Sequence, residues 1–294
     1  MTPAEKALAH VRARFPHPGP AVTAPITVNF HPDRLLSDAR TVIEHLAADG
    51  VYRTQYETGI SNGGLGGDRP LWERRMFGDG GSRPVYGALN LPGHPDGAAP
   101  RFGSCHLRLA AHVNARATYS LGDSHTLPQI LGTAATFGAV WDGLLAQVTR
   151  TGTALGVTAT DPQRWRQAAL AAPRSDAGRT LDDYVEAQIH GGVSITDDVT
   201  HLIADPSFRG TPHEDTLRSL GVPVRWHPGF HLQADAFPDT LRGPETAHLA
   251  REIAARYRRP VLNAEVIGRA ARDGDHPQLV KYLWHILVML GRPA

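Results

Sequence analysis

Residues 182–192, Asp-Asp-Tyr-Val-Glu-Ala-Gln-Ile-His-Gly-Gly, contain the pattern on which the fold prediction rests. From residue 184 onward, polar and apolar side chains alternate, which is the period of a β-strand with one face toward a core. We predict a strand over residues 182–190, with Glu186 and Gln188 on its polar face. A half-exposed antiparallel strand alternates in this way, and so does a strand whose polar face lines a cleft, so the pattern leaves both open.

The segments on both sides of this strand mix strand and helix patterns. Short apolar stretches predict strands over residues 26–30, 51–56, 104–109 and 117–121, and a hairpin over residues 222–234. Helical periodicity predicts helices over residues 2–14, 33–49, 161–171, 196–204, 244–256, 263–272 and 276–290, and one within residues 127–148. Asp33 is the predicted N-cap of the second helix, and Gly50 ends it. This mixed order predicts an α+β fold and not regular βαβ winding.

Length and composition divide the chain into three parts. It has 294 residues, enough for one large domain or two ordinary ones. We expect an N-terminal helix and proline-rich hinge at residues 1–25, a catalytic α+β domain at 26–240, and a C-terminal helical segment at 241–294 that packs on it. Residues 69–103 are dense in glycine, proline and arginine, and so long an excursion is expected to pack or to cover a ligand.

The charge balance, 30 Lys and Arg against 29 Asp and Glu, argues against a protein that holds duplex nucleic acid through a bulk basic field and leaves a local basic patch open. Only Lys6 and Lys281 are lysines, so anion recognition would depend on planar arginine forks. A lone Cys105 excludes an internal disulfide framework, and neither a signal peptide nor an apolar run of membrane-spanning length is visible. We therefore expect a soluble cytoplasmic protein with no membrane partner.

One arginine interrupts an apolar strand pattern. This residue, Arg53, follows the apolar pair Val51-Tyr52 and precedes the glycine-rich loop at residues 59–67. Arginine forks and loop N–H groups are the donors that hold phosphate or pyrophosphate, whereas an arginine on an edge strand can also simply face water. The candidate phosphate-binding residues in this stretch are Arg53, Thr54, Ser61, Asn62, Gly63 and Gly64.

Two hydroxyls share one face of the strand predicted at residues 117–121. Thr118 and Ser120 lie two residues apart, so both point to the same side, where they can orient a carboxylate or a ribose. A solvent-facing strand has the same pattern. Ser124-His125 lies just beyond, but the sequence lacks the G-x-S-x-G turn of a nucleophilic serine.

Histidine is abundant, with 16 residues. His227 and His231 flank a turn and could share a metal, but there is no H-E-x-x-H motif and ordinary surface histidines explain them more simply. We predict no metal site. Cys105 is expected to be a small buried side chain and not a nucleophile.

Several strings resemble a bacterial family of unknown function that occurs in actinobacterial genomes. The resemblance covers most of residues 26–270. Its strings are FHPDR (30–34), YRTQYETGISNGGL (52–65), WERRMFG (72–78), YGALNL (86–91), PRFGSCHLRL (100–109), EAQIHG (186–191) and DPSFRGT (205–211).

A weaker resemblance implies a function. A strand arginine, then a hydroxyl-rich strand, then a glutamate on a third strand is similar to the Arg–Ser–Glu class of ADP-ribosyltransferases. It implies a mixed or antiparallel split sheet of the ADP-ribosyltransferase type with flanking helices, and NAD as the substrate. By position the catalytic roles fall on Arg53, Ser120 and Glu186. The arginine holds an NAD phosphate, the serine orients the glutamate, and the glutamate stabilises an oxocarbenium-like ribose.

The resemblance also places Thr118 and Gln188 among the binding residues. In that class the catalytic glutamate stands two residues after a Gln or Glu. In this chain, if Glu186 is the catalytic residue, Tyr184 stands where the class has Gln or Glu. If Glu186 is that first residue, Gln188 stands where the class has the catalytic glutamate. The implied enzyme is an NAD-dependent glycosyltransferase or an NAD glycohydrolase, and the acceptor is left open among protein, nucleic acid, small molecule and water.

The chemistry of NAD cleavage calls for a carboxylate and aromatic rings independently of the resemblance. Breaking a nicotinamide–ribose bond builds positive charge on the sugar, so one carboxylate is the central electrostatic group. The aromatic residues available to stack on nicotinamide or adenine are Tyr52, Tyr56, Trp72 and Phe77.

Two other functions are open from the residues alone. A non-enzymatic binding module for a nucleotide or a partner protein would use the arginines only to recognise phosphate. A phosphoester or nucleotide hydrolase, with or without a metal, would use His31, Asp33, Asp123 and His125.

Overall fold

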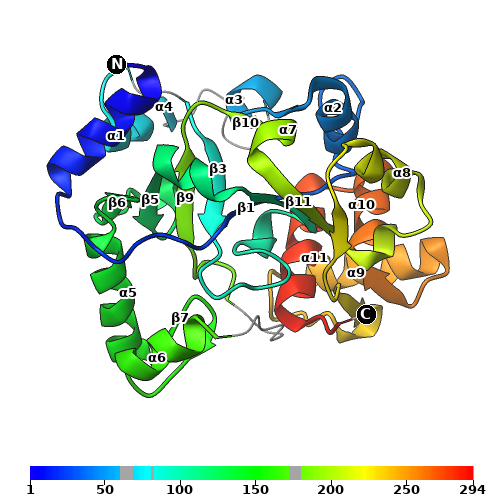
Figure 1. Cartoon of the computed structure of the whole chain (residues 1–294). Coiled ribbons are helices and arrows are strands. Elements are labelled where there is room, and N and C mark those ends of the chain that lie inside the picture. The colour runs from blue at the N-terminus through cyan, green and yellow to red at the C-terminus, as the bar shows by residue number, and fades with distance from the viewer. Residues whose placement is uncertain (60–68, 81–82, 172–179, 294) are drawn as a thin grey trace.

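The computed structural model describes residues 1–59, 69–80, 83–171 and 180–293, and its centre is a mixed eight-stranded sheet (Figure 1). The strand order is β12-β11-β4-β1-β3-β9-β5-β6, and all neighbours are antiparallel except β11 and β12. The predicted α+β class with a helical C-terminus is confirmed. The strands of this sheet are β1 (Ile26–Phe30), β3 (Val85–Leu89), β4 (Cys105–Leu109), β5 (Ala117–Leu121), β6 (Leu131–Thr133), β9 (Val185–Ile189), β11 (Val199–Ala204) and β12 (Val224–Trp226).

Strand β9 lies inside the sheet, between β3 and β5. Its apolar side chains Val185, Ala187 and Ile189 belong to the main hydrophobic core, as the alternation predicted. The polar face is also buried, because helix α4 (Arg69–Phe77) covers part of it and Phe77 contacts the ring of His190 at 5.0 Å. β9 is therefore not a half-exposed strand, and its polar residues face the interior of the protein.

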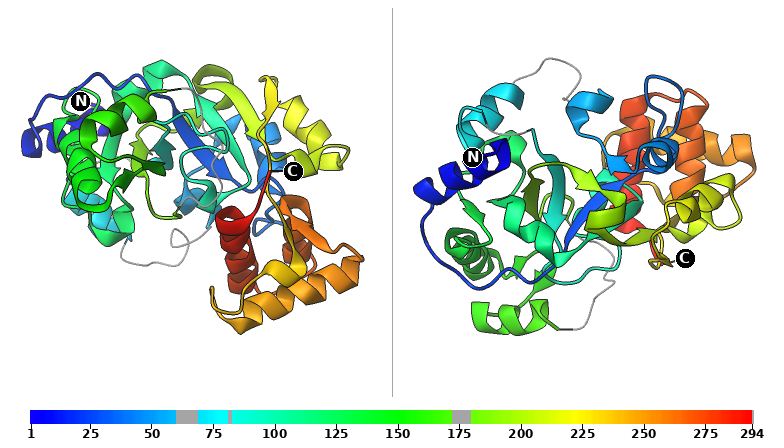
Figure 2. Two further views of the ribbon diagram at one scale, coloured as in Figure 1. Left: turned by 90° about the horizontal axis from the view of Figure 1, so that it is seen from below. Right: turned by 45° about the horizontal axis from the view of Figure 1, so that its top comes forward.

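The helices lie in two groups on opposite sides of the sheet centre (Figures 1 and 2). The first group contains α1 (Pro3–Arg14), α4, α5 (Gly138–Thr151) and α6 (Pro162–Ala169). The second contains α8 (Pro212–Ser219), α9 (Pro244–Tyr257), α10 (Ala264–Arg272) and α11 (Pro277–Leu290), with α11 packed on α9 and α10. The three helices predicted for the C-terminus are confirmed within one or two residues at each end.

Two predicted boundaries near the N-terminus are wrong. Asp33 does not cap a helix: α2 (Val42–Asp49) begins after Thr41, whose hydroxyl accepts from the Glu44 N–H while the Glu44 carboxylate binds the Thr41 N–H. The strand predicted over 51–56 contains only β2 (Val51–Tyr52), because Thr54 starts a short helix, α3 (Gln55–Thr58), with the same capping arrangement.

Two further predictions fail because long-range pairing outweighs local pattern. Only α7 (Ile195–Asp198) of the helix predicted over 196–204 is helical, and the rest is β11, which pairs with β4. The hairpin predicted over 222–234 does not form: β12 pairs in parallel with β11, and β13 (His231–Gln233) pairs with β14 (Val261–Asn263).

The segment 127–148 and the excursion 69–103 are also more structured than predicted. The first holds β6 and only then α5, because Leu131–Thr133 pairs with the neighbouring β5. The second contains α4, β3 and the short 3-10 helix η2 (Pro100–Phe102). Within the described part of the chain, no helix has the length and apolar character that crossing a lipid bilayer requires.

Candidate functional site

A cavity of about 370 Å³ opens beside the polar face of the central sheet. Side chains from β1, β3, β9, α4 and α11 line it, together with residues of η2 and of the short 3-10 helix η4 (Ser124–Thr126). This volume is in the range of small-molecule sites. The basic side chains that line it are Arg34, Arg53, Arg69, Arg101 and Lys281, and the acidic ones are Asp123 and Glu186.

Glu186 is the carboxylate on the sheet that reaches the cavity. It is 5% exposed, and its oxygens accept hydrogen bonds from the Gln188 amide at 2.9 Å and from the Ser124 backbone N–H at 3.4 Å. Burial, with the nearby Asp123 carboxylate as the next cause, raises the pKa of Glu186 to about 7. Glu186 therefore changes its charge near neutral pH, which is typical of a group that takes part in chemistry.

A hydrogen-bonded chain fixes the Glu186 side chain from behind. The Gln188 amide nitrogen donates to both Glu186 and the Ser120 hydroxyl, each at 2.9 Å, and the Thr118 hydroxyl donates to the Gln188 carbonyl at 2.8 Å. All of these residues are buried, and Glu186 and Ser120 are direct partners across β9 and β5. The structure thus brings together four residues that the sequence selected separately.

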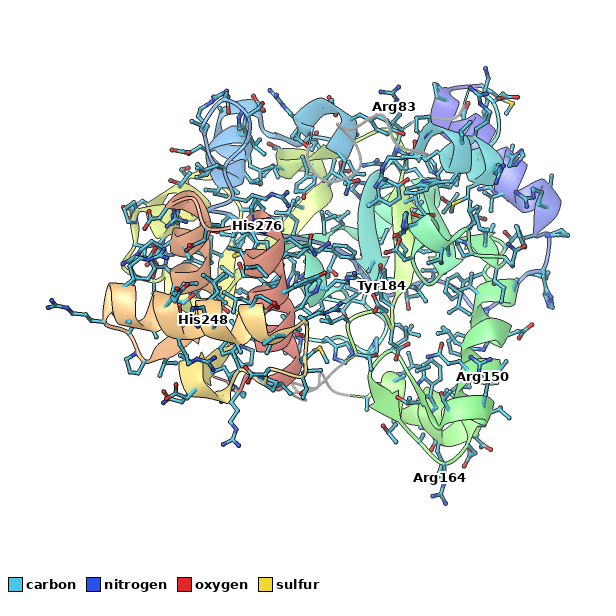
Figure 3. All side chains as sticks on the ribbon, turned by 180° about the vertical axis from the view of Figure 1, so that it is seen from behind. Arg83, Arg150, Arg164, Tyr184, His248 and His276 are labelled. Atoms are coloured by element: carbon cyan, nitrogen blue, oxygen red, sulfur yellow. The ribbon has the colours of Figure 1, made fainter. Side chains whose placement is uncertain are left out.

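Glu186 and Gln188 are the two candidates for the catalytic position of the motif, and their places relative to the cavity differ. Glu186 lines the cavity, whereas the Gln188 side chain is fully buried behind it. Tyr184, labelled in Figure 3 near the start of β9, donates its hydroxyl to Asp123 at 3.0 Å. Of Glu186 and Gln188, Glu186 is therefore the one that a ligand in this cavity can contact.

Arg53 lines the cavity but is held by a neighbouring carboxylate. Its guanidinium contacts Asp49 at 2.7 Å, just after β2 ends. The Thr54 side chain caps helix α3 and donates to Glu57 at 2.7 Å. The other candidates of this stretch, Ser61 to Gly64, lie outside the described residues.

Arg69 is a site residue that the sequence analysis missed. Its guanidinium carbon lies 5.0 Å and 4.8 Å from the ring centroids of Trp72 and Tyr86. Its Nη1 atom lies 3.6 Å from Glu73 Oε1. Its Nε and Nη1 atoms are buried and find no hydrogen-bond acceptor among the described residues. The i, i+3, i+4 spacing of Arg69, Trp72 and Glu73 on one helix face was the available signal.

Glu73 organises this wall of the cavity. The hydroxyls of Tyr86 and Tyr56 donate to its two oxygens at 2.6 Å and 2.9 Å. Burial and the charge of Glu73 raise the pKa of Tyr86 well above its ordinary value, so Tyr86 stays a neutral donor. Tyr86 also lies next to Gln188 across β3 and β9, which places Arg69 and its rings beside Glu186.

The aromatic candidates have different positions. Tyr52 and Trp72 line the cavity, and so does Phe102, whose ring is 46% exposed and which the sequence analysis did not select. Phe77 is buried in a small core cluster with Trp72. With Phe30 and Tyr86, which also line the cavity, Tyr52, Trp72 and Phe102 are therefore rings that a ligand can contact.

The four residues of the hydrolase alternative are not all together. His31, Asp123 and His125 line the cavity, but Asp33 is buried in an ion pair with Arg272 of α10. Burial lowers the pKa of His31 to about 3, with the charge of Arg34 adding to the shift, so its ring is neutral. Within the described ranges, no group of three or more His, Cys, Asp or Glu side chains is placed to hold a metal ion.

The remaining candidates are structural. His227 is buried and donates from Nε2 to the Ser104 carbonyl at 2.8 Å, while its Nδ1 accepts from the Gly229 N–H. Cys105 is buried in the core, and burial raises the pKa of its thiol well above the ordinary value. Both ring nitrogens of His227 are thus already engaged, and Cys105 lacks the exposure and thiolate character of a nucleophile.

Fold and cavity together define an α+β protein with a charged, aromatic-lined pocket beside its central strand. The chain belongs to the family described as a protein of unknown function (DUF3626), whose model matches residues 25–290. The family membership inferred from the sequence strings is thereby supported at the level of an uncharacterised family.

Two phage proteins are similar to this chain. One is the Gene 2 protein of Mycobacterium phage L5, 29% identical over 189 residues, which cover 60% of this chain and 66% of the phage protein. The other is the Gene 2 protein of Mycobacterium phage D29, 29% identical over 201 residues, which cover 65% and 73%. The match thus spans just under two thirds of the L5 protein.

Proposed function

We propose that this protein cleaves the nicotinamide–ribose bond of an NAD-type dinucleotide, as an ADP-ribosyltransferase or an NAD glycohydrolase. The observation that carries the proposal is the position of Glu186. It is a buried carboxylate, fixed by Gln188 and Ser124, that opens into a pocket with arginines and aromatic rings. As part of the same proposal, the central sheet is of the ADP-ribosyltransferase type.

The charge distribution of the pocket supports a dinucleotide. Glu186 and Asp123 lie close enough for one to shift the pKa of the other upward, so this end of the pocket favours a positive ligand group. The oxidised nicotinamide ring is a cation. Arg69 lines the same pocket, and its Nε and Nη1 atoms, which have no hydrogen-bond acceptor among the described residues, suit the negative pyrophosphate that follows the ribose.

In the proposed reaction the C–N bond to nicotinamide breaks, and its electron pair leaves with neutral nicotinamide. The ribose carbon becomes an oxocarbenium ion, which the ionised Glu186 stabilises electrostatically. An acceptor oxygen or nitrogen, or water, then bonds to that carbon and loses a proton. Ser120 and Gln188 act as positioning residues, because they hold Glu186 without reaching the cavity themselves.

The test is nicotinamide release from NAD and NADP by the full chain, measured by chromatography. We expect Glu186→Gln to lower the rate by about 10²- to 10³-fold, since it removes the charge that stabilises the transition state. Glu252→Gln on α9, where the carboxylate is exposed and contacts His248, is the matched control and should retain the rate.

Two outcomes would overturn the proposal. One is full turnover in the Glu186→Gln variant. The other is tight dinucleotide binding by the wild-type chain with no nicotinamide released, which would indicate a non-enzymatic binding module.

A further inference from the structure

Two basic side chains of the pocket have no acidic partner among the residues that the structure describes. Arg53 faces Asp49, Arg69 faces Glu73 and Arg101 faces Asp182. Arg34 and Lys281 line the same cavity, yet neither side chain makes an ion pair or hydrogen bond with any residue that the structure describes. Positive charge without a counter-charge in a cavity is the property of an anion site.

These two cations line the same cavity and lie near one another. Lys281 is in the second turn of α11, and Arg34 follows β1. Burial lowers the pKa of Lys281, and the positive charges of Arg101, Arg242 and Arg34 add to the shift, so these four groups are neighbours. The charge that raises the pKa of Glu186 is instead that of Asp123.

Two neutral histidines flank the cations. Burial is the main cause that lowers the pKa of His31 and of His285 to about 3, so neither ring contributes charge at neutral pH. Both ring nitrogens of His285 are buried without a hydrogen-bond partner in the described part of the chain. Arg34, Lys281 and His31 line the cavity, and His285, one turn after Lys281 on α11, lies behind them with ring nitrogens that no described residue satisfies.

An exposed ring in the same cavity lies beside Arg101, whose charge also acts on Lys281. Phe102, in η2, is 46% exposed and lines the cavity, and the Arg101 guanidinium carbon lies 5.1 Å from the centroid of its ring. Its ring also contacts that of Tyr184, the residue that donates to Asp123. Phe102 is thus a surface on which a base can stack, placed between the acidic end and the cations.

We propose that Arg34 and Lys281 form a subsite for a phosphate monoester, and that the substrate nucleotide carries such a group on the adenosine whose base stacks on Phe102. The pocket would then prefer NADP-type dinucleotides to NAD. A diphosphate bound at Arg69 leaves Arg34 and Lys281 without a partner, whereas a second, separate phosphate dianion neutralises both. The identity of the ligand as a dinucleotide rests on the proposed function, but the phosphate subsite does not.

The experiment is calorimetric titration of the full chain at low salt with NAD, NADP, 5′-AMP and 2′,5′-ADP. We expect the extra phosphate to strengthen binding about tenfold within each pair, NADP over NAD and 2′,5′-ADP over 5′-AMP. Lys281→Gln and Arg34→Gln should each bring these ratios toward one. Lys6→Gln, which alters the only other lysine, on α1, should leave them unchanged.

The outcomes separate the subsite from the reaction. Equal affinity within both pairs, or ratios that Lys281→Gln and Arg34→Gln leave intact in folded protein, would overturn the subsite. Binding that inorganic phosphate strengthens while both ratios stay at one would assign the cations to a separate phosphorylated molecule and also overturn it. A preserved 2′,5′-ADP preference without nicotinamide release would leave the subsite standing and remove the proposed reaction.

Discussion

Ser120 of β5 and Glu186 of β9 are direct partners across the central antiparallel pair, and one amide group joins them. The Gln188 nitrogen donates to the Ser120 hydroxyl and to the Glu186 carboxylate, each at 2.9 Å. The Ser120 hydroxyl in turn donates to the Gly122 carbonyl at 3.0 Å. The carboxylate that opens into the pocket is thereby held in place from within the sheet.

Ser120→Ala is expected to lower the turnover number for nicotinamide release about tenfold, because Gln188 loses one of the two acceptors that orient it. The Michaelis constant should hardly change, since Ser120 does not line the cavity. Steady-state kinetics measures both. Ser219→Ala, which removes an exposed hydroxyl on α8, is the control. An unchanged turnover number in Ser120→Ala would contradict a positioning role.

Turnover should rise with pH through about 7. The pKa of Glu186 is raised to about 7, so the carboxylate that stabilises the sugar cation forms only as the pH passes this value. In Asp123→Asn the midpoint should move to lower pH, because a charge that raises this pKa is removed. A pH–rate profile from 5 to 9 measures the shift, and an unmoved midpoint in Asp123→Asn would contradict the assignment.

The same shift makes a prediction about stability. A carboxyl whose pKa is higher in the folded than in the unfolded protein costs stability above that pKa, and costs none below the unfolded value. Glu186→Gln should therefore match the wild type near pH 4.5 and exceed its free energy of unfolding by about 3 kcal/mol at pH 8. Urea unfolding at both pH values tests this, and a constant difference would contradict the buried titration.

Arg69→Met is expected to weaken NAD binding about tenfold or more, since a charge-assisted contact to pyrophosphate is lost. Stability should fall as well, because the buried Glu73 carboxylate loses the positive charge 3.6 Å away and keeps only its two tyrosine donors. Titration calorimetry and thermal unfolding measure the two effects. The control is Arg74→Met in the same helix, where the side chain is exposed and contacts Asp79. Equal affinity in both variants would exclude Arg69 from the site.

Arg272→Met should destabilise the protein by about 3 kcal/mol at pH 7, because it leaves the buried Asp33 carboxylate unpaired. Burial raises the pKa of Asp33 to about 6 even with Arg272 present, so the loss should shrink at pH 5, where Asp33 takes up a proton. Urea unfolding measures both values. Arg269→Met, one turn earlier, removes a half-exposed partner of Glu265 and should cost less than about 1 kcal/mol.

Local pattern was sufficient to predict several elements. The alternation over residues 185–189 predicted β9, and the apolar spacing near the C-terminus predicted α9, α10 and α11. These elements bury their apolar residues along one face, and that periodicity is already present in the chain. The polar face of β9, with Glu186, Gln188 and Ser120 as candidates, was predicted for the same reason.

Tertiary contacts decided what the polar residues do. Asp33 has the sequence of a helix cap, but its partner is Arg272, 239 residues away. Arg69 is one of many arginines in the sequence, and only the fold places its guanidinium over the rings of Trp72 and Tyr86.

Sequence alone therefore determined the α+β class, the central strand and the carboxylate on it, because side-chain periodicity is a local property. Only the tertiary structure decided that the polar face is buried, and that Arg34, Lys281 and Phe102 share its cavity. Burial and charge at a point in space depend on segments from β1, η2, β9 and α11 together, and no stretch of sequence records their approach.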